Sequence, residues 1–290
     1  MKRIALLGQP YDSAVRNLGM GAGVDVLLKE RKLPERLERD GYDVALRFVV
    51  GSEEQGYEIR RTLALDRQLA ALVREAVDEH RFPIVLAGNC NSALGTTAGL
   101  ARDNIAVAWF DAHADLDTPE NNLSGFFDVF ALSMLTGQAW QALTQTIEGF
   151  QPIPETRIVL TGVRDLEPYQ AEHLRRSQIH VVYGDDIRSR GLAEAFEPAL
   201  EAALATASAL YLHVDLDSLD PAEGTANRYA APGGLTRTDL STAFEIIARS
   251  GRRVLAAAIT AYDPACDSER KMASTAEDVV SEIANRFAVD

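Results

Sequence analysis

Residues 105–115 read IAVAWFDAHAD, an apolar run that ends abruptly in acids and one imidazole. The first part, Ile105–Phe110, is apolar at every position, which is typical of a parallel strand that is buried on both faces. Beyond it, Asp111, His113 and Asp115 occupy every second position. Alternate side chains of an extended segment face the same way, so we expect these three to project toward one side at the carboxyl end of a strand.

Apolar runs of the same kind recur along the whole chain, and longer amphipathic stretches separate them. Further strands are expected over residues 4–7, 44–49, 83–87, 158–160, 179–182, 209–214 and 254–259. Helices are expected over residues 24–39, 58–80, 92–102, 129–136, 193–205, 237–250 and 269–288. This alternation favours a three-layer α/β/α sandwich with a mostly parallel sheet of about eight strands. Because no Pro- or Ser-rich linker interrupts it, we expect residues 1–290 to form a single domain.

The composition limits the classes of protein to consider. Of the 290 residues 47% are hydrophobic and 25% are charged, which excludes a disordered or fibrous chain. The formal net charge of −14 disfavours nucleic acid and anionic membrane surfaces as partners, since both are themselves negative. We expect no signal peptide and no membrane span, and two cysteines do not make a disulfide scaffold. The sequence therefore predicts a cytoplasmic protein.

A second acidic group follows the apolar run 209–214, where the chain reads Asp215-Leu-Asp217-Ser-Leu-Asp220. Carboxylates at the end of a buried strand are costly unless their charge is balanced, and neither acidic motif contains a Lys or Arg. Two divalent cations would balance it, because carboxylate and imidazole ligands suit them and a shared carboxylate supports a hydrolytic dinuclear site. The alternatives are loop caps or solvated acids, and a calcium loop, which would lack its turn glycine here.

Cys90 belongs to a third pattern, in which the expected strand 83–87 ends in small polar residues before a helix. A thiolate is favoured near a helix N-terminus, which would make Cys90 reactive. The alternative is a buried structural cysteine. His213 lies two positions before Asp215 on the same expected strand face, and we interpret it as a packed strand residue.

These patterns together resemble the motifs of the arginase–agmatinase (ureohydrolase) family. The family has a G-G-D-H turn, a D-A-H-x-D motif and a D-x-D-x-x-D-P motif followed by a Gly-Gly pair. Residues 87–90, 111–115, 215–221 and 233–234 match them in order and spacing. The resemblance covers essentially the whole chain and implies an arginase-like fold. It also implies two divalent ions, manganese by family preference, and a bridging hydroxide that attacks a guanidinium or amidine carbon.

The resemblance also implies which side chains hold the ions. Asp111 and Asp215 would be shared by both ions. The other ligands would serve one ion each, namely Cys90 and Asp115 for the first ion and His113 and Asp217 for the second.

Three positions near the expected metal centre depart from the family pattern. Cys90 stands where the family has a ligand histidine, a change that resembles the N-hydroxyarginine hydrolase branch. Asp128 stands at the position of a catalytic histidine, where a carboxylate would carry protons or, alternatively, cap a helix over 129–136. Ala261 stands where the family has an acid that holds the substrate guanidinium, so the resemblance gives weaker support to an unmodified guanidinium.

The expected substrate contacts lie in loops. Ser124 and Asp117 match family positions that contact the carboxylate end of the substrate, and Asp117 replaces an asparagine there. Glu167 falls where the family holds an α-amino group, and it is equally well explained as the first-turn acid of a helix. Tyr229, in the long loop after Asp220, is expected either to line the pocket or to pack within its own loop.

We therefore predict a dinuclear-metal hydrolase of linear C–N bonds that acts on a guanidine, hydroxyguanidine or amidine compound. A narrower alternative is the hydrolysis of N-hydroxyarginine to hydroxyurea and ornithine. The third alternative is a catalytically silent, metal-binding family member, which the altered residues at positions 90, 128 and 261 suggest. The sequence does not fix the oligomeric state, because the family ranges from monomers to homo-oligomers.

Overall fold

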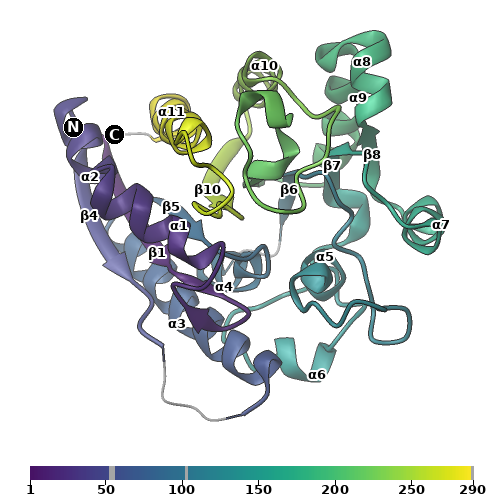
Figure 1. The fold of residues 1–290 in the computed structure, drawn as a ribbon, viewed down its shortest axis with the longest axis horizontal. Coiled ribbons are helices and arrows are strands. Elements are labelled where there is room, and N and C mark those ends of the chain that lie inside the picture. The colour runs from purple at the N-terminus through teal and green to yellow at the C-terminus, as the bar shows by residue number, and fades with distance from the viewer. Residues whose placement is uncertain (52–55, 102–103, 289–290) are drawn as a thin grey trace.

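The computed structural model describes residues 1–51, 56–101 and 104–288, and its centre is a parallel sheet of eight strands (Figure 1). Their spatial order is β4 (Asp43–Phe48), β1 (Arg3–Gln9), β5 (Phe82–Ala87), β10 (Arg253–Thr260), β9 (Ala209–Asp215), β6 (Ile105–Phe110), β7 (Ile158–Val163) and β8 (His180–Tyr183). All neighbouring pairs are parallel. Each strand overlaps one expected apolar run, and the predicted fold class is confirmed.

Helices cover both faces of this sheet, which gives the three layers. One face is covered by α3 (Glu58–Asp78), α4 (Ser92–Leu100), α5 (Ala131–Leu135) and α7 (Pro168–Arg176). The other face is covered by α1 (Gly21–Asp25), α2 (Leu33–Arg39), α8 (Gly184–Arg190), α9 (Leu192–Leu204), α10 (Arg237–Arg249) and α11 (Lys271–Phe287). A further short helix, α6 (Gln141–Thr144), and a hairpin, β2 (Tyr11–Asp12) with β3 (Val15–Arg16), lie outside the sheet.

The two faces of the sheet carry separate hydrophobic cores, and the strands supply both of them. In β1, Ile4 and Leu6 belong to one core, whereas Ala5 and Leu7 belong to the other. Because both faces are covered, polar residues have no favourable place in the middle of the strand. This explains why the strands read as continuous apolar runs.

Some expected helices differ from those in the structure. The stretch 24–39 is divided among α1, a π-helical turn (Val26–Glu30) and α2, because Lys32 adopts a left-handed φ of +55° and Pro34 has no N–H to donate. The helix expected over 129–136 begins as a 3₁₀ turn, Asp128–Phe130, before α5. Arg102, at the end of the helix expected over 92–102, lies outside the described residues.

The strand order brings together carboxyl ends that are far apart in the sequence. β10 lies between β5 and β9, and β9 pairs on its other side with β6. Thr260, the last residue of β10, is in register with Ala87 of β5 and with Asp215 of β9. Ligands of open α/β sheets bind at such carboxyl ends, where the strand order changes direction. None of the helices in the described ranges has both the length and the apolarity that a membrane crossing requires.

Candidate metal centre

The tips of β6 and β9 are built in the same way. Asp111 Oδ1 accepts the backbone N–H of His113 at 2.8 Å, and Asp215 Oδ1 accepts that of Asp217, also at 2.8 Å. This Asx-type turn lets an aspartate bond its own backbone two residues further on. The residues after Phe110 are therefore not the extended continuation that we expected. β6 stops there, and Asp115 adopts a left-handed φ of +49°.

The predicted ligand residues from these tips converge. The ligand atoms of Cys90, Asp111 and Asp215 all lie within 4.8 Å of one another, and so do those of Asp111, His113 and Asp217. Asp111 belongs to both groups, which is the arrangement that two metal ions sharing a carboxylate require. With Asp115, these side chains form what we call the acidic cluster.

Asp115 lines a cavity together with Cys90, His113, Asp215 and Asp217, but it belongs to neither group of ligand atoms. In the described part of the chain, no hydrogen bond reaches its carboxylate. Burial first, and then the charges of Asp111 and Asp128, raise the pKa of Asp115 well above its usual value. A buried carboxylate with no partner is unfavourable, and a bound cation would stabilise it.

The charges of the acidic cluster are poorly balanced by the protein itself. His113 Nδ1 lies 3.3 Å from Asp111 Oδ1 and 3.5 Å from Asp217 Oδ2. Within the described ranges, no Lys or Arg forms an ion pair with any of the cluster's four carboxylates. Arg164 reaches the same loop, but its guanidinium donates to backbone carbonyls, among them that of Asp217 at 2.7 Å. The carboxylates are thus left facing one another.

This imbalance shows in the pKa values. Burial first, and then the nearby aspartates, raise the pKa of Asp215 well above its usual value, and burial also raises that of Asp217. Burial opposes ionisation of Asp111 too, but hydrogen bonds from His113 and Trp109 lower its pKa overall. Carboxylate, imidazole and sulfur donors suit divalent transition metals. The residues present therefore fit a pair of divalent ions.

Cys90 is fully buried at the turn between β5 and α4. Its sulfur lies 2.9 Å from Asp215 Oδ2 and 3.1 Å from Thr260 Oγ1. Burial first, and then Asp215, raise the pKa of the Cys90 thiol well above its usual value. A sulfur held this close to a carboxylate is placed as a ligand would be, and a cation between them would favour the thiolate.

Asp128 is anchored to the turn that carries Cys90. Its Oδ2 accepts the backbone N–H of Cys90 and the side-chain amide of Asn89, each at 3.0 Å, and its Oδ1 accepts the N–H of Asn91 at 3.0 Å. It makes no capping bond to the helical turn that follows it. Burial raises the pKa of Asp128 to about 7. Its side chain therefore stabilises the turn before α4.

A cavity of about 330 Å³ opens onto the cluster, and the predicted substrate residues Asp117, Ser124, Glu167 and Tyr229 all line it. Ala261 lines it too, at the position where the family resemblance implies an acid. The ring of Tyr229 stacks on that of Phe126 with 5.6 Å between centroids. Glu167 lies at the N-terminus of α7 in a capping box with Gln170, so both interpretations of Glu167 describe its position.

Three polar residues that line the cavity escaped the sequence analysis. Tyr169 and Gln170 donate to the buried carboxylate of Asp117 at 3.0 and 2.9 Å. Asn227 donates to Asp217 Oδ2 at 3.1 Å and to the carbonyl of Ala261 at 3.0 Å. The position of Asn227 in the long loop after Asp220 was a usable signal, since such loops build sites. Tyr169 and Gln170 lie in a helix that the apolar pattern does not predict.

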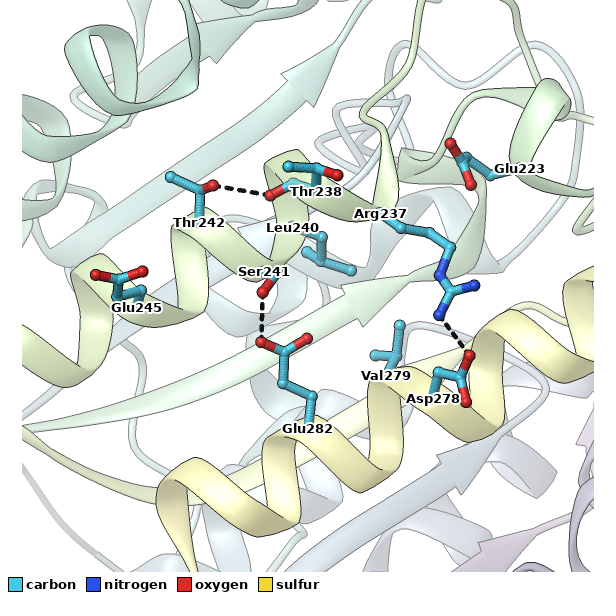
Figure 2. Close-up of a pocket in the computed structure, with 10 residues that line it drawn as sticks. All are labelled: Glu223, Arg237, Thr238, Leu240, Ser241, Thr242, Glu245, Asp278, Val279 and Glu282. Atoms are coloured by element: carbon cyan, nitrogen blue, oxygen red, sulfur yellow. Dashed lines mark hydrogen bonds and ion pairs between the residues drawn. The ribbon is translucent and has the colours of Figure 1, made fainter.

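A second cavity, of about 520 Å³, lies between α10 and α11 and contains none of the predicted site residues (Figure 2). Four acids line it, namely Glu223, Glu245, Asp278 and Glu282. Figure 2 shows Arg237 reaching across to Asp278, and Glu282 accepts the Ser241 hydroxyl at 2.6 Å. We call it the α10–α11 groove.

Comparison with known proteins agrees with this geometry. The family model of the arginases matches residues 2–285. The chain belongs to the arginase family. The arginase of Bacillus caldovelox is 30% identical over 289 residues, covering 95% of this chain and 96% of the relative. The arginase of Bacillus subtilis strain 168 is 28% identical over 292 residues, covering 97% of each.

Solved structures of the family have the same fold. The Bacillus caldovelox arginase superposes with a TM-score of 0.87 at 29% identity, over 98% of both chains. The formimidoylglutamase of Bacillus subtilis, at 18% identity, shares the fold with a TM-score of 0.77 over 98% of this chain and 87% of that one. The family hydrolyses C–N bonds of amidines, the guanidino group included, and this arginase-family chain is a hydrolase of that class. Arginases use a binuclear metal centre, typically of manganese.

Proposed function

We propose that the chain is a dinuclear-metal amidinohydrolase that acts on a guanidine, hydroxyguanidine or amidine compound. The observation that carries the proposal is the pair of overlapping ligand groups that share Asp111, in a cluster whose four carboxylates form no ion pair with a Lys or Arg among the described residues. When bound, two divalent ions supply a Lewis acid and lower the pKa of a water molecule toward neutrality. The two ions would be manganese, by family preference.

The chain's own side chains divide the work of holding the ions. Asp111 and Asp215, on neighbouring strands, would be the shared ligands. Cys90 and Asp115 would complete one site, and His113 and Asp217 would complete the other. Asn227 would keep Asp217 oriented, because its amide bonds the Oδ2 atom that faces His113.

Asp128 is the best-placed group to carry a proton to the leaving amine. It lines the cavity beside the cluster, and three N–H groups hold its carboxylate in one orientation. A carboxylate offers about four lone-pair positions, so one stays free. Burial brings its pKa to about 7, and proton transfer is efficient when the pKa lies near the working pH.

The lining of the cavity supports a cationic or neutral substrate. Among the described residues no Lys or Arg lines it, whereas several acids do. A guanidinium or amidinium would be attracted to this wall, and a substrate carboxylate would find no ion-pair partner there. Ser124 and Tyr229 would contact the part of the substrate that lies away from the cluster, together with Asp117 and Glu167.

The test combines metal analysis with turnover. We expect the purified protein to bind two equivalents of manganese and to release urea or a related product from at least one compound of a guanidine and amidine panel. Asp111→Asn should lose both, while Asp220→Asn, a carboxylate outside the two ligand groups, should keep two ions. Absence of metal at saturating manganese and zinc would contradict the proposal. Two bound ions without turnover on the whole panel would support the silent family member instead.

A second candidate is the hydrolysis of N-hydroxyarginine to hydroxyurea and ornithine. It is favoured by one observation, the placement of Cys90 sulfur against Asp215 where the family resemblance implies a histidine. A higher kcat/KM for N-hydroxyarginine than for arginine and for guanidines without a carboxylate would support it. A preference for guanidines without a carboxylate would contradict it.

A further inference from the structure

A line of buried polar side chains runs from the inside of the sheet to Cys90. The Tyr211 hydroxyl lies 2.9 Å from His213 Nδ1, His213 Nε2 lies 3.3 Å from Thr260 Oγ1, and Thr260 Oγ1 lies 3.1 Å from the Cys90 sulfur. All four side chains are almost completely inaccessible to solvent. The line ends at the acidic cluster, because the same sulfur lies 2.9 Å from Asp215.

This line is more than ordinary core packing. Buried polar groups are costly unless they are bonded, and apolar residues of similar size would fill the same space without that cost. On the same face of β10, Ala256 and Ala258 are core residues, and the opposite face of β9 carries Leu210, Leu212 and Val214. Within the line, each polar group is satisfied by the next one.

The imidazole in the middle of the line is held in place from two directions. Its ring stacks on Trp109 with 3.6 Å between centroids, and the Trp109 indole N–H donates to Asp111 Oδ2 at 2.9 Å. A neutral imidazole offers one donor and one acceptor, and the Tyr211 and Thr260 hydroxyls lie against its two nitrogens. One layer of side chains therefore supports Asp111 through Trp109 and Cys90 through Thr260.

The strand order brings Thr260 next to the turn that carries Cys90. β10 lies between β5, which leads into Cys90, and β9, which ends at Asp215. Thr260 is in register with Ala87 on one side and with Asp215 on the other. Its hydroxyl therefore lies beside the sulfur, at 3.1 Å, on the strand between the two ligand-bearing strands.

We propose that Thr260 and His213 are positioning residues that aim the Cys90 sulfur at the metal site. His213 acts through Thr260, and Thr260 acts through its hydrogen bond to the sulfur. This inference rests on the proposed role of Cys90 as a metal ligand.

The test uses cobalt as the metal probe and the near-ultraviolet charge-transfer absorption of a sulfur–cobalt bond as the readout. We expect the band in wild type and its loss in Cys90→Ala. The band should remain in Cys266→Ser, which removes the other cysteine of the chain. Thr260→Val should shift or weaken the band and lower cobalt affinity by about 10- to 100-fold, as removal of an outer-shell partner does. Thr260→Ser, which keeps the hydroxyl, should restore both.

A matched control is available in the neighbouring part of the sheet. Thr161 on β7 is equally buried, but its hydroxyl has no hydrogen-bond partner in the described structure, so Thr161→Val should leave the band and the affinity unchanged. His213→Phe keeps a ring against Trp109 and removes both nitrogens, and it should move the band in the same direction as Thr260→Val.

The outcomes separate the two proposals. A wild-type protein without the band would overturn ligation by Cys90 and the positioning role with it. A wild-type band that Thr260→Val leaves unchanged in energy, intensity and affinity would overturn the positioning role alone. Equal changes in Thr260→Val and Thr161→Val would also overturn it, because they would show a general effect of core substitution.

Discussion

The acidic cluster and the α10–α11 groove both gather carboxylates around a cavity, yet their charges are balanced differently. In the groove, Asp278 lies 2.8 Å from Arg36 and also pairs with Arg237, while Glu282 lies 2.8 Å from Arg286. These side chains remain partly open to solvent. In the cluster, Asp115 and Asp215 are buried, and no Lys or Arg pairs with them in the described ranges.

The difference shows what distinguishes a site from an acidic surface. Partners and solvent stabilise the groove acids, and Asp278 has a lowered pKa because its arginines outweigh the effect of burial. Asp115 and Asp215 of the cluster have raised pKa values because burial and mutual repulsion act together. Buried carboxylates that the fold holds together without a basic partner indicate a cation site. The number of acids around a cavity does not by itself indicate one.

The largest contrast is expected from removing one carboxylate charge on each side. Asp215→Asn removes a proposed shared ligand, and we expect metal affinity to fall by more than about 100-fold, since even outer-shell partners are worth 10- to 100-fold. Turnover should fall with it. Glu282→Gln in the groove should change neither. Isothermal titration with manganese measures the affinities, and unaltered binding in Asp215→Asn would remove the distinction between the two regions.

The next contrast is the pH dependence of the metal-free protein. Burial raises the pKa of Asp128 to about 7 in the folded state, against about 3.9 when unfolded. The contribution of Asp128 to the free energy of unfolding is therefore complete below about pH 4. As the pH rises toward 7 this contribution is lost, by up to about 4 kcal/mol. Asp128→Asn should flatten this part of the profile, measured by urea unfolding in chelator. If the free energy of unfolding of wild type and of Asp128→Asn changed with pH in parallel, this prediction would be wrong.

Metal binding should stabilise the protein through the cluster alone. At a free manganese concentration about 100 times the Kd, we expect the free energy of unfolding to rise by about 2.7 kcal/mol. Urea titrations with and without manganese measure the change. Glu282→Gln should show the full increase and Asp215→Asn much less, and equal stabilisation of both variants would place the ion elsewhere.

The smallest effect is expected in the groove. Asp278→Asn should lower the free energy of unfolding by about 1 kcal/mol or less, because its ion pairs are partly exposed and solvent screens them. The loss should shrink at high salt. Since the folded-state pKa of Asp278 is lowered, its contribution disappears as the pH falls, opposite in sign to that of Asp128. A large loss that is independent of salt would contradict this view of the groove.

Much of the fold could be predicted because burial on both faces leaves a simple pattern. Every strand of the sheet overlaps an expected apolar run, and α3 (Glu58–Asp78) follows its expected range closely. α7 was missed because it buries little, with Leu174 as its only buried residue. α8 was missed for a related reason, since local capping rather than an apolar stripe defines it.

In the candidate site, too, some features could be predicted from the sequence and others could not. Asp111 and Asp215 could be found because each directly follows an apolar run. The partners of Asp128 could not be found, because they lie on a turn 37 to 39 residues earlier in the chain. Nor does any local pattern link Thr260 to Cys90, which are 170 residues apart.

By itself the sequence determined the layers, the strands and the acidic tips, because each depends on short-range periodicity and on polar residues that follow an apolar run. Only the tertiary structure decided which tips meet, since the strand order β5-β10-β9-β6 does not follow the order of the chain. It also decided the charge balance. Asp278 meets its arginines and Asp215 meets none within the described part of the chain, because such pairing depends on distances in space between residues that are distant in the sequence.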